Sequence, residues 1–250
     1  MRHLLRRHNW LGSPPTPDKA CALNGKSDMW TVWNIGPVTI QLAAVGLALI
    51  LSVPLSVAAY RLPRSLDGAI SPVPSVAHRR WRMGVLIAGV ILAMLCALRF
   101  GPTPAAVAAI VYVNVLLTLA WIDAETGFLP DMMTISLLWL GLLVNVNDTF
   151  ALLGHAVVGA AAGYMLLWSI SGLFLLLAGR QGMGHGDFKL LAALGAWVGW
   201  MSLPWVLIIS SSLALAMAFM QRLRGRLDAK ASFSFGPYLA IAGIVVLLRL

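Results

Sequence analysis

Two aspartates, Asp123 and Asp187, are the residues of this chain whose type and position could do chemistry. Each lies at the end of an apolar run that is long enough to enter a lipid bilayer. An ionisable side chain near membrane depth is energetically costly and usually serves a function. If two carboxylates meet, one can act as a base on water while the other holds a proton, which is the minimum equipment of an aspartyl protease. This chemistry requires the fold to bring the two side chains together.

The segment after Asp123 contains two more acids, Glu125 and Asp131. Asp131 comes directly after a proline and opens an apolar run, which favours a helix N-cap over a catalytic role. Glu125 is predicted to lie in a solvated loop. Asp123 itself ends an apolar run, where no cap is needed. Judged alone, Asp123 could equally be a catalytic group or an interfacial residue that faces lipid headgroups.

Asp187 ends a glycine-dense element, Gly182-Met-Gly-His-Gly-Asp187. Glycine permits a backbone with positive φ and lets another chain approach closely, so Gly184 and Gly186 are candidate site-shaping residues. The same element could be only a turn at the entry to a membrane helix. Lys189 is expected to extend its ammonium group toward the cytoplasmic interface.

The composition is that of an integral membrane protein. The chain has 250 residues, of which 60% are hydrophobic and 11% are charged, and its mean hydropathy is +0.85. A soluble domain cannot hide that much apolar surface, and continuous rather than alternating apolar runs favour helices. The predicted fold class is therefore all-α, a polytopic membrane bundle of about eight transmembrane helices in contact with lipid.

Eight apolar segments support this prediction. A helix needs ~20 residues to cross the hydrocarbon core of a bilayer, and the length of each segment is judged against this number. They occupy residues 35–60, 83–98, 103–122, 132–147, 150–178, 187–200, 202–220 and 234–249. The remaining N-terminal residues are polar and contain three prolines. We expect two parts, a polar tail at residues 1–34 and a membrane domain at residues 35–250.

The net charge is +9, and the basic residues fall in short loops between apolar segments. This distribution is typical of loops that set the orientation of a membrane protein, so no nucleic-acid partner is expected. The basic loop at residues 61–82 has five arginines against one acid, whereas the tail has only Lys19 and Lys26 close to the first span. We therefore predict that this loop is cytoplasmic and that the N-terminus lies outside. Alternation of the spans then puts Asp123 and Asp187 on the cytoplasmic side.

Metal and disulfide chemistry find no support in the sequence. The two cysteines, Cys21 and Cys96, are far apart and form no CxxC pair, and the histidines do not cluster. Neither a zinc site nor a disulfide framework can be built from these residues. We expect no metal, and the chemistry of two aspartates needs no cofactor.

Several motifs occur together over about residues 50–245. The main ones are Asp123-x-x-Thr126-x-x-Leu129-Pro130-Asp131-x-x-Thr134 and Gly184-His-Gly186-Asp187-Phe-Lys189, accompanied by Tyr60-Arg-Leu-Pro63, Leu138–Leu142, Ala193–Trp197 and Phe235-Gly-Pro237. In combination they strongly resemble the bacterial type IV prepilin peptidases, which are GxGD-type membrane aspartyl proteases.

The resemblance implies that Asp123 and Asp187 are the catalytic pair and that Asp131 is a supporting residue. It also implies a prepilin or pseudopilin substrate, whose basic leader stays in the cytoplasm while its apolar helix lies in the membrane. Cleavage would follow a glycine at the cytoplasmic boundary of the bacterial inner membrane. The oligomeric state and the particular pilin stay open.

One departure from the family concerns methyl transfer. Bifunctional members carry, after the YRLP element, a cytosolic segment with paired CxxC motifs that is linked to methylation of the new pilin N-terminus. Here the basic loop at residues 61–82 replaces that segment and contains no cysteine, and Ser52 and Ser56 stand where the family has glycine and asparagine. The expectation is a peptidase without methyltransferase activity, with S-adenosylmethionine needed only if that activity were retained.

A proton-coupled transporter is the main rival from another functional class. Such a protein needs ionisable residues near the middle of its spans, with broken helices around them. The centres of the predicted spans are nearly free of charge, and both aspartates lie toward one side. A catalytically silent pilus-assembly subunit is also disfavoured, because a scaffold has no use for both aspartates and the glycine element.

Overall fold

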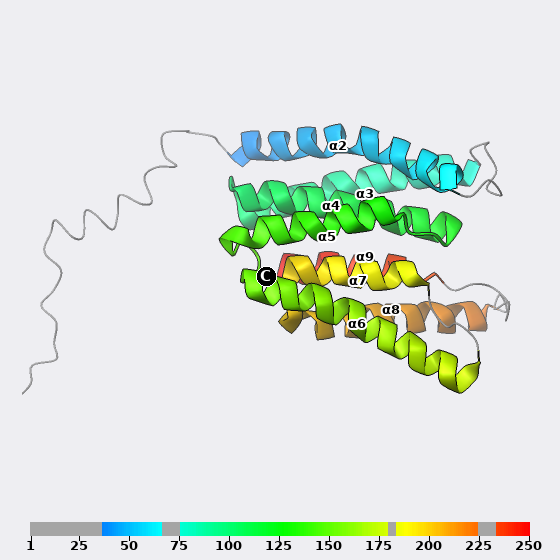
Figure 1. Ribbon diagram of the computed structural model, residues 1–250. Helices are drawn as coiled ribbons and strands as arrows, with labels where there is room; N and C mark the ends of the chain where they lie inside the picture. The colour runs from blue at the N-terminus through cyan, green and yellow to red at the C-terminus, as the bar shows by residue number, and fades with distance from the viewer. Residues whose placement is uncertain (1–36, 67–75, 180–183, 225–233) are drawn as a thin grey trace, which may run out of the picture. The chain divides into compact units, whose positions relative to one another are not determined.

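The structure is a computed structural model that describes residues 37–66, 76–179, 184–224 and 234–250, and helices dominate this part of the chain (Figure 1). No strand occurs within these ranges. The α-helices are α2 (Pro37–Leu66), α3 (Val76–Phe100), α4 (Pro104–Thr126), α5 (Asp131–Val144), α6 (Leu153–Ala178), α7 (His185–Val198), α8 (Leu203–Leu223) and α9 (Gly236–Arg249). There are also two short 3-10 helices in the described part of the chain. The first, η2 (Asn145–Asn147), follows α5, and the second, η3 (Trp200–Ser202), precedes α8.

Five of the described helices, α2, α3, α4, α6 and α8, are long and apolar enough to cross a membrane. Helices α5, α7 and α9 have 14 residues each, or about 21 Å at ~1.5 Å per residue. Each of the eight predicted apolar segments coincides with one helix. The predicted fold class, an all-α polytopic membrane bundle, is confirmed.

The predicted boundaries of the basic loop at residues 61–82 are too wide. Helix α2 continues to Leu66 and α3 begins at Val76, so only residues 67–75 lie between the two helices, outside the described ranges. Arginine and leucine are good helix formers, which lets a helix continue beyond the apolar residues that cross the membrane. The predicted tail at residues 1–34 also lies outside the described ranges.

Helix α7 is the most buried element and positions the second aspartate. Every residue from Leu190 to Val198 is buried, and the helix contacts α5, α6 and α9. Figure 1 shows α7 in yellow between α5 and α6. A helix that is apolar on all sides is stable only when neighbours cover all of its faces, and these contacts provide that cover.

The contact between α6 and α7 depends on glycines. A Cβ atom on Gly159 would lie 2.5 Å from the carbonyl oxygen of Gly195, and one on Gly163 would lie 2.7 Å from that of Leu191. The two backbones are therefore closer than any side chain allows. Two glycines four positions apart, Gly159 and Gly163, thus form a face of α6 on which α7 can pack closely.

The contact between α5 and α7 is fixed by hydrogen bonds at the end of α7 remote from Asp187. The Trp197 indole donates to the carbonyl oxygen of Leu137 over 2.9 Å. The Asn145 amide donates to the carbonyl oxygens of Ala196 and Trp197, each over 2.9 Å. These bonds satisfy carbonyl groups at the C-terminal end of α7 and hold the helix in register beside α5.

Candidate active site

Asp123 lies in the last turn of α4, where the end of the helix fixes its position. Gly127 adopts the left-handed conformation (φ 66°), and its backbone amide donates to the Asp123 carbonyl oxygen over 2.8 Å. The Thr126 hydroxyl donates to the Ile122 carbonyl oxygen over 2.8 Å. The sequence Asp-x-x-Thr-Gly therefore ends the helix one turn after the aspartate and turns the chain toward α5.

Asp131 begins α5, but it is not the N-cap that its position after a proline predicts. Pro130 occupies the cap position in an extended conformation (φ −65°, ψ 123°) and offers no side-chain cap. Because the proline takes this place, Asp131 becomes the first helical residue and its carboxylate is free to turn outward. The carboxylate forms an ion pair with Lys189, and its Oδ2 accepts a hydrogen bond from the Lys189 Nζ over 2.6 Å. The sequence does not indicate this partner for Lys189.

Asp187 lies in the first turn of α7. Gly184 precedes the helix in an extended conformation (φ −74°, ψ 145°), and its carbonyl oxygen accepts from the Asp187 amide over 3.2 Å. The predicted use of glycine for positive φ is therefore wrong at Gly184. Asp187 is 7% exposed and Asp123 is 5% exposed, so neither carboxyl group faces open surroundings.

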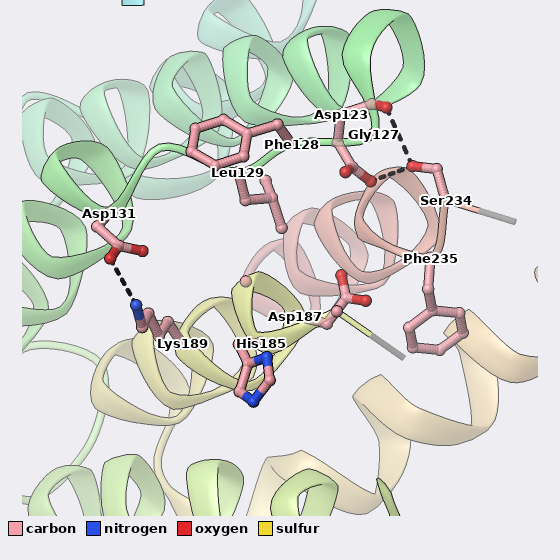
Figure 2. Close-up of a pocket in the computed structure, with 12 residues that line it drawn as sticks. Asp123, Gly127, Phe128, Leu129, Asp131, His185, Asp187, Lys189, Ser234 and Phe235 are labelled. Carbon is pink, nitrogen blue, oxygen red and sulfur yellow. Dashed lines mark hydrogen bonds and ion pairs between the residues drawn. The ribbon is translucent and has the colours of Figure 1, made fainter. Parts of the chain in front are cut away.

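Both aspartates line one cavity of about 350 Å³. Their carboxyl groups point into it and toward each other, from α4 and from α7 (Figure 2). The structure brings to this cavity the two candidate catalytic residues, Asp123 and Asp187, together with Gly184, Gly186, Asp131 and Lys189. Its lining consists of Asp123, Gly127, Phe128, Leu129, Asp131, Gly184, His185, Gly186, Asp187, Lys189, Ser234 and Phe235.

Leu129 packs between the elements that carry the two aspartates. A Cβ atom on Gly186 would lie 2.8 Å from Cβ of Leu129, and one on Gly236 would lie 3.3 Å from its Cδ1. A Cβ atom on Gly236 would also lie 2.5 Å from Oδ2 of Asp123. Close approach, the second predicted use of glycine, therefore applies at Gly186. Gly236 belongs to the Phe-Gly-Pro motif, and its missing side chain lets the start of α9 approach Asp123 and Leu129 closely.

Ser234 is a site residue that the sequence analysis missed. Its hydroxyl contacts Oδ2 of Asp123 and lies 3.2 Å from the Asp123 carbonyl oxygen (Figure 2). The only signal in the sequence is that Ser234 directly precedes the Phe235-Gly-Pro237 motif. A serine at such a place gives no indication of its partner, which lies 111 positions earlier in the chain.

The electrostatics of the cavity link the two carboxyl groups. Asp187 lies outside the five helices of membrane-spanning length. The pKa of Asp187 is raised from 3.8 to about 7. Burial is the larger cause, and repulsion from the Asp123 carboxylate is the smaller one. Two nearby carboxyl groups resist a second negative charge, so the pair holds one proton near neutral pH.

This arrangement can activate a water molecule between a base and an acid. No group of three or more His, Cys, Asp or Glu side chains suited to a metal ion occurs among the described residues. The cavity opens where α4, α5, α7 and the start of α9 meet, which is the end of the helices rather than their middle. A peptide bond presented at this end of the helices could therefore reach both acids.

Comparisons with known proteins show which proteins this chain is similar to. Residues 110–219 match the model of the type IV leader peptidase family. A Burkholderia pseudomallei protein named prepilin leader peptidase/N-methyltransferase is 50% identical over 148 residues, which are 59% of this chain and 48% of that protein. Proteins of the same name from Dickeya chrysanthemi and Pseudomonas aeruginosa are 48% identical over 150 residues (60% of this chain, 53% of the relative) and 43% identical over 185 residues (74% and 63%). No solved structure matches the chain.

The chain spans about half the length of the first curated relatives that it matches. The matched family segment runs from the second turn of α4 to near the end of α8. It includes both aspartates, the chain that joins α4 to α5, and the glycine element. This part of the chain belongs to the type IV leader peptidase family.

Proposed function

We propose that this chain is a membrane aspartyl endopeptidase that removes the leader of type IV prepilin-like proteins. Asp123 and Asp187 are its catalytic residues. Gly184, Gly186, Asp131 and Lys189 shape the site around them. The observation that carries the proposal is that two buried carboxyl groups, far apart in the sequence, line one cavity at the end of the helix bundle.

The reaction needs only the two carboxyl groups and one water molecule. The ionised carboxylate removes a proton from water, the water oxygen bonds to the scissile carbonyl carbon, and the protonated carboxyl group gives its proton to the carbonyl oxygen. The C–N bond of this intermediate then breaks. The amide nitrogen takes the proton that came from water, and one hydroxyl of the intermediate returns its proton to the other carboxylate. The pair again holds one proton.

The proposed substrate has a basic leader in the cytoplasm and an apolar helix in the bacterial inner membrane. Such a substrate exposes its scissile bond at the cytoplasmic boundary, where a site at the helix ends can reach it. Charge attraction does not explain recognition of the leader, because the connections on this side of the enzyme are basic too. The one lysine of the cavity, Lys189, is already paired with Asp131.

The test is replacement of each acid by its isosteric amide. Asp123→Asn and Asp187→Asn are each expected to abolish cleavage of a prepilin in a gel-shift assay while the protein accumulates in the membrane. Asp148→Asn is the matched control, because Asp148 lies outside the cavity and accepts a hydrogen bond from the Leu153 amide that asparagine can preserve. Normal cleavage by either active-site variant would refute the catalytic pair.

Methylation of the new N-terminus is the second candidate activity, because the relatives carry N-methyltransferase in their names. S-adenosylmethionine would supply the methyl group. The cysteine-containing segment that the family links to this step has no counterpart here, since α2 and α3 are separated only by residues 67–75, which contain no cysteine. We propose cleavage without methylation. Mass spectrometry of the mature pilin tests this, and a product heavier by one methyl group would contradict it.

A further inference from the structure

We propose that Ser234 is a positioning residue that keeps Asp123 as the ionised base of the pair and so assigns the shared proton to Asp187. This inference rests on the proposed peptidase function and deepens it. It concerns a residue outside the two aspartate motifs.

The Ser234 hydroxyl has one hydrogen and two acceptors within reach, Oδ2 and the carbonyl oxygen of Asp123. The carbonyl oxygen already accepts from the Gly127 amide over 2.8 Å. A carboxylate is also a stronger acceptor than a neutral carbonyl. The hydrogen is therefore donated to Oδ2, and a hydrogen bond to the charged form of a carboxyl group favours that form.

The surroundings of Asp187 differ from those of Asp123. Within the described residues no hydroxyl or amide donates to the Asp187 carboxyl group, and burial disfavours its charge. When two carboxyl groups share a proton, it resides on the one whose charge is less well stabilised. The difference between the two sites places it on Asp187.

Other charged groups of the cavity do not reverse this assignment. Lys189 of α7 and Asp131 of α5 neutralise each other. His185 is exposed, and Glu125 is exposed and does not line the cavity. The described segment before α9 contributes only Ser234 and Phe235, which are uncharged. Ser234 is thus the side chain that distinguishes the two aspartates, and the backbone amide of Gly236 acts on Asp123 in the same direction.

The test is the pH profile of kcat/KM for prepilin cleavage by the full chain in detergent. Loss of a hydrogen bond to a charged group is expected to move the acidic limb of the profile about one pH unit higher in Ser234→Ala. At pH values on the acidic side of the limb, kcat/KM is then about tenfold lower than in the parent protein. At higher pH, the plateau of kcat/KM stays close to that of the parent. Ser212→Ala on the exposed face of α8 is the matched control and keeps the parent profile.

A second pair of variants separates the hydroxyl group from packing. Threonine and valine have nearly the same shape, and only threonine can donate. Ser234→Thr is expected to keep the parent acidic limb, whereas Ser234→Val shifts it upward. Equal profiles for these two variants, a uniform loss at all pH values, or a downward shift of the acidic limb would each overturn the inference. The downward shift would mean that Ser234 accepts a hydrogen bond from a protonated Asp123.

Infrared titration of protonated carboxyl groups provides a measurement without substrate. The lower of the two coupled carboxyl titrations is expected to move upward in Ser234→Val and to stay in place in Ser234→Thr. If the parent protein cleaves no prepilin, the proposed function fails, and this titration still decides the role of Ser234. If the parent cleaves prepilin and the titrations of the two variants coincide, only the inference fails.

Discussion

Gly186 lies one residue before Asp187, and its missing side chain sets how closely α7 approaches Leu129. A Cβ atom at this position would lie 2.8 Å from Cβ of Leu129, which is too short for unstrained packing. Relief of this contact must move α7 away from the chain that joins α4 to α5. The two carboxyl groups would then separate.

Gly186→Ala is therefore expected to lower the rate of prepilin cleavage about 100-fold, since displacement of reacting groups by ~1 Å has an effect of this order. Gly184→Ala provides the comparison within the same motif, because a Cβ atom there meets nothing within 4 Å. Its loss is expected to be much smaller. The measurement is a time course of cleavage with equal amounts of folded enzyme, and equal losses in the two variants would contradict the steric argument.

The pKa of Asp187 gives a prediction about pH. Burial and the Asp123 carboxylate raise this pKa to about 7. Asp187 therefore holds its proton below about pH 7 and loses it above, which removes the acid of the reaction. Cleavage is expected to fall about tenfold per pH unit on the alkaline side.

A kcat/KM profile in detergent measures this alkaline limb. The stability of the protein over the same pH range must be followed in parallel, so that loss of folded enzyme is not mistaken for loss of the proton. Constant activity well above neutral pH would show that Asp187 does not act as an acid.

At the scale of elements, the close contact between α6 and α7 holds the helix that carries Asp187 in place. A Cβ atom on Gly159 would face backbone atoms of Gly195, Gly199 and Trp200, none of which can rotate away. Gly159→Ala is expected to destabilise the protein by about 1–3 kcal/mol through overpacking. Gly172→Ala in the same helix meets nothing within 4 Å and is expected to be neutral or to stabilise by up to about 1 kcal/mol.

Thermal unfolding of the two variants in the same detergent measures this difference. Activity of the remaining folded Gly159→Ala protein should also be lower, because α7 carries Asp187. Equal melting temperatures for the two variants would contradict the packing argument.

The elements themselves could be predicted from sequence, because long apolar runs specify membrane helices almost independently of their neighbours. Each of the eight apolar segments located one helix. The ends of helices were less predictable, as α2 and α3 show, because charged residues continue a helix beyond its apolar part.

The site was predictable only in its motif residues. Asp123 and Asp187 were identified from their unusual positions and from the family resemblance. Leu129, Ser234 and the ion pair between Asp131 and Lys189 were not, because these contacts join residues far apart in the chain and depend on how α4, α5, α7 and α9 pack. No local pattern of residue types encodes such packing.

At the scale of the whole molecule, several basic helix ends lie at the same end of the bundle as the aspartates. Ala59, near the end of α2, packs against Trp121 and Ile122, so Arg61 lies near the Asp123 end of α4. Arg222 and Arg224 end α8, whose connection leads to Ser234 beside Asp123. By the positive-inside rule we propose that this end of the bundle is cytoplasmic.

The prediction for the whole molecule is that cysteine labelling follows this orientation. In a background without Cys21 and Cys96, Glu125→Cys is expected to react with a membrane-impermeant maleimide only after the inner membrane is opened. Asp148→Cys, an exposed residue in the connection between α5 and α6, should react in intact spheroplasts. Both positions are exposed. Glu125 lies in the last turn of α4, and Asp148 follows η2 beyond the far end of the next helix, α5, so they form a matched pair. The reverse pattern would put the two carboxyl groups on the side of the membrane where no prepilin leader is present, and cleavage at the cytoplasmic boundary would then be physically impossible for this site.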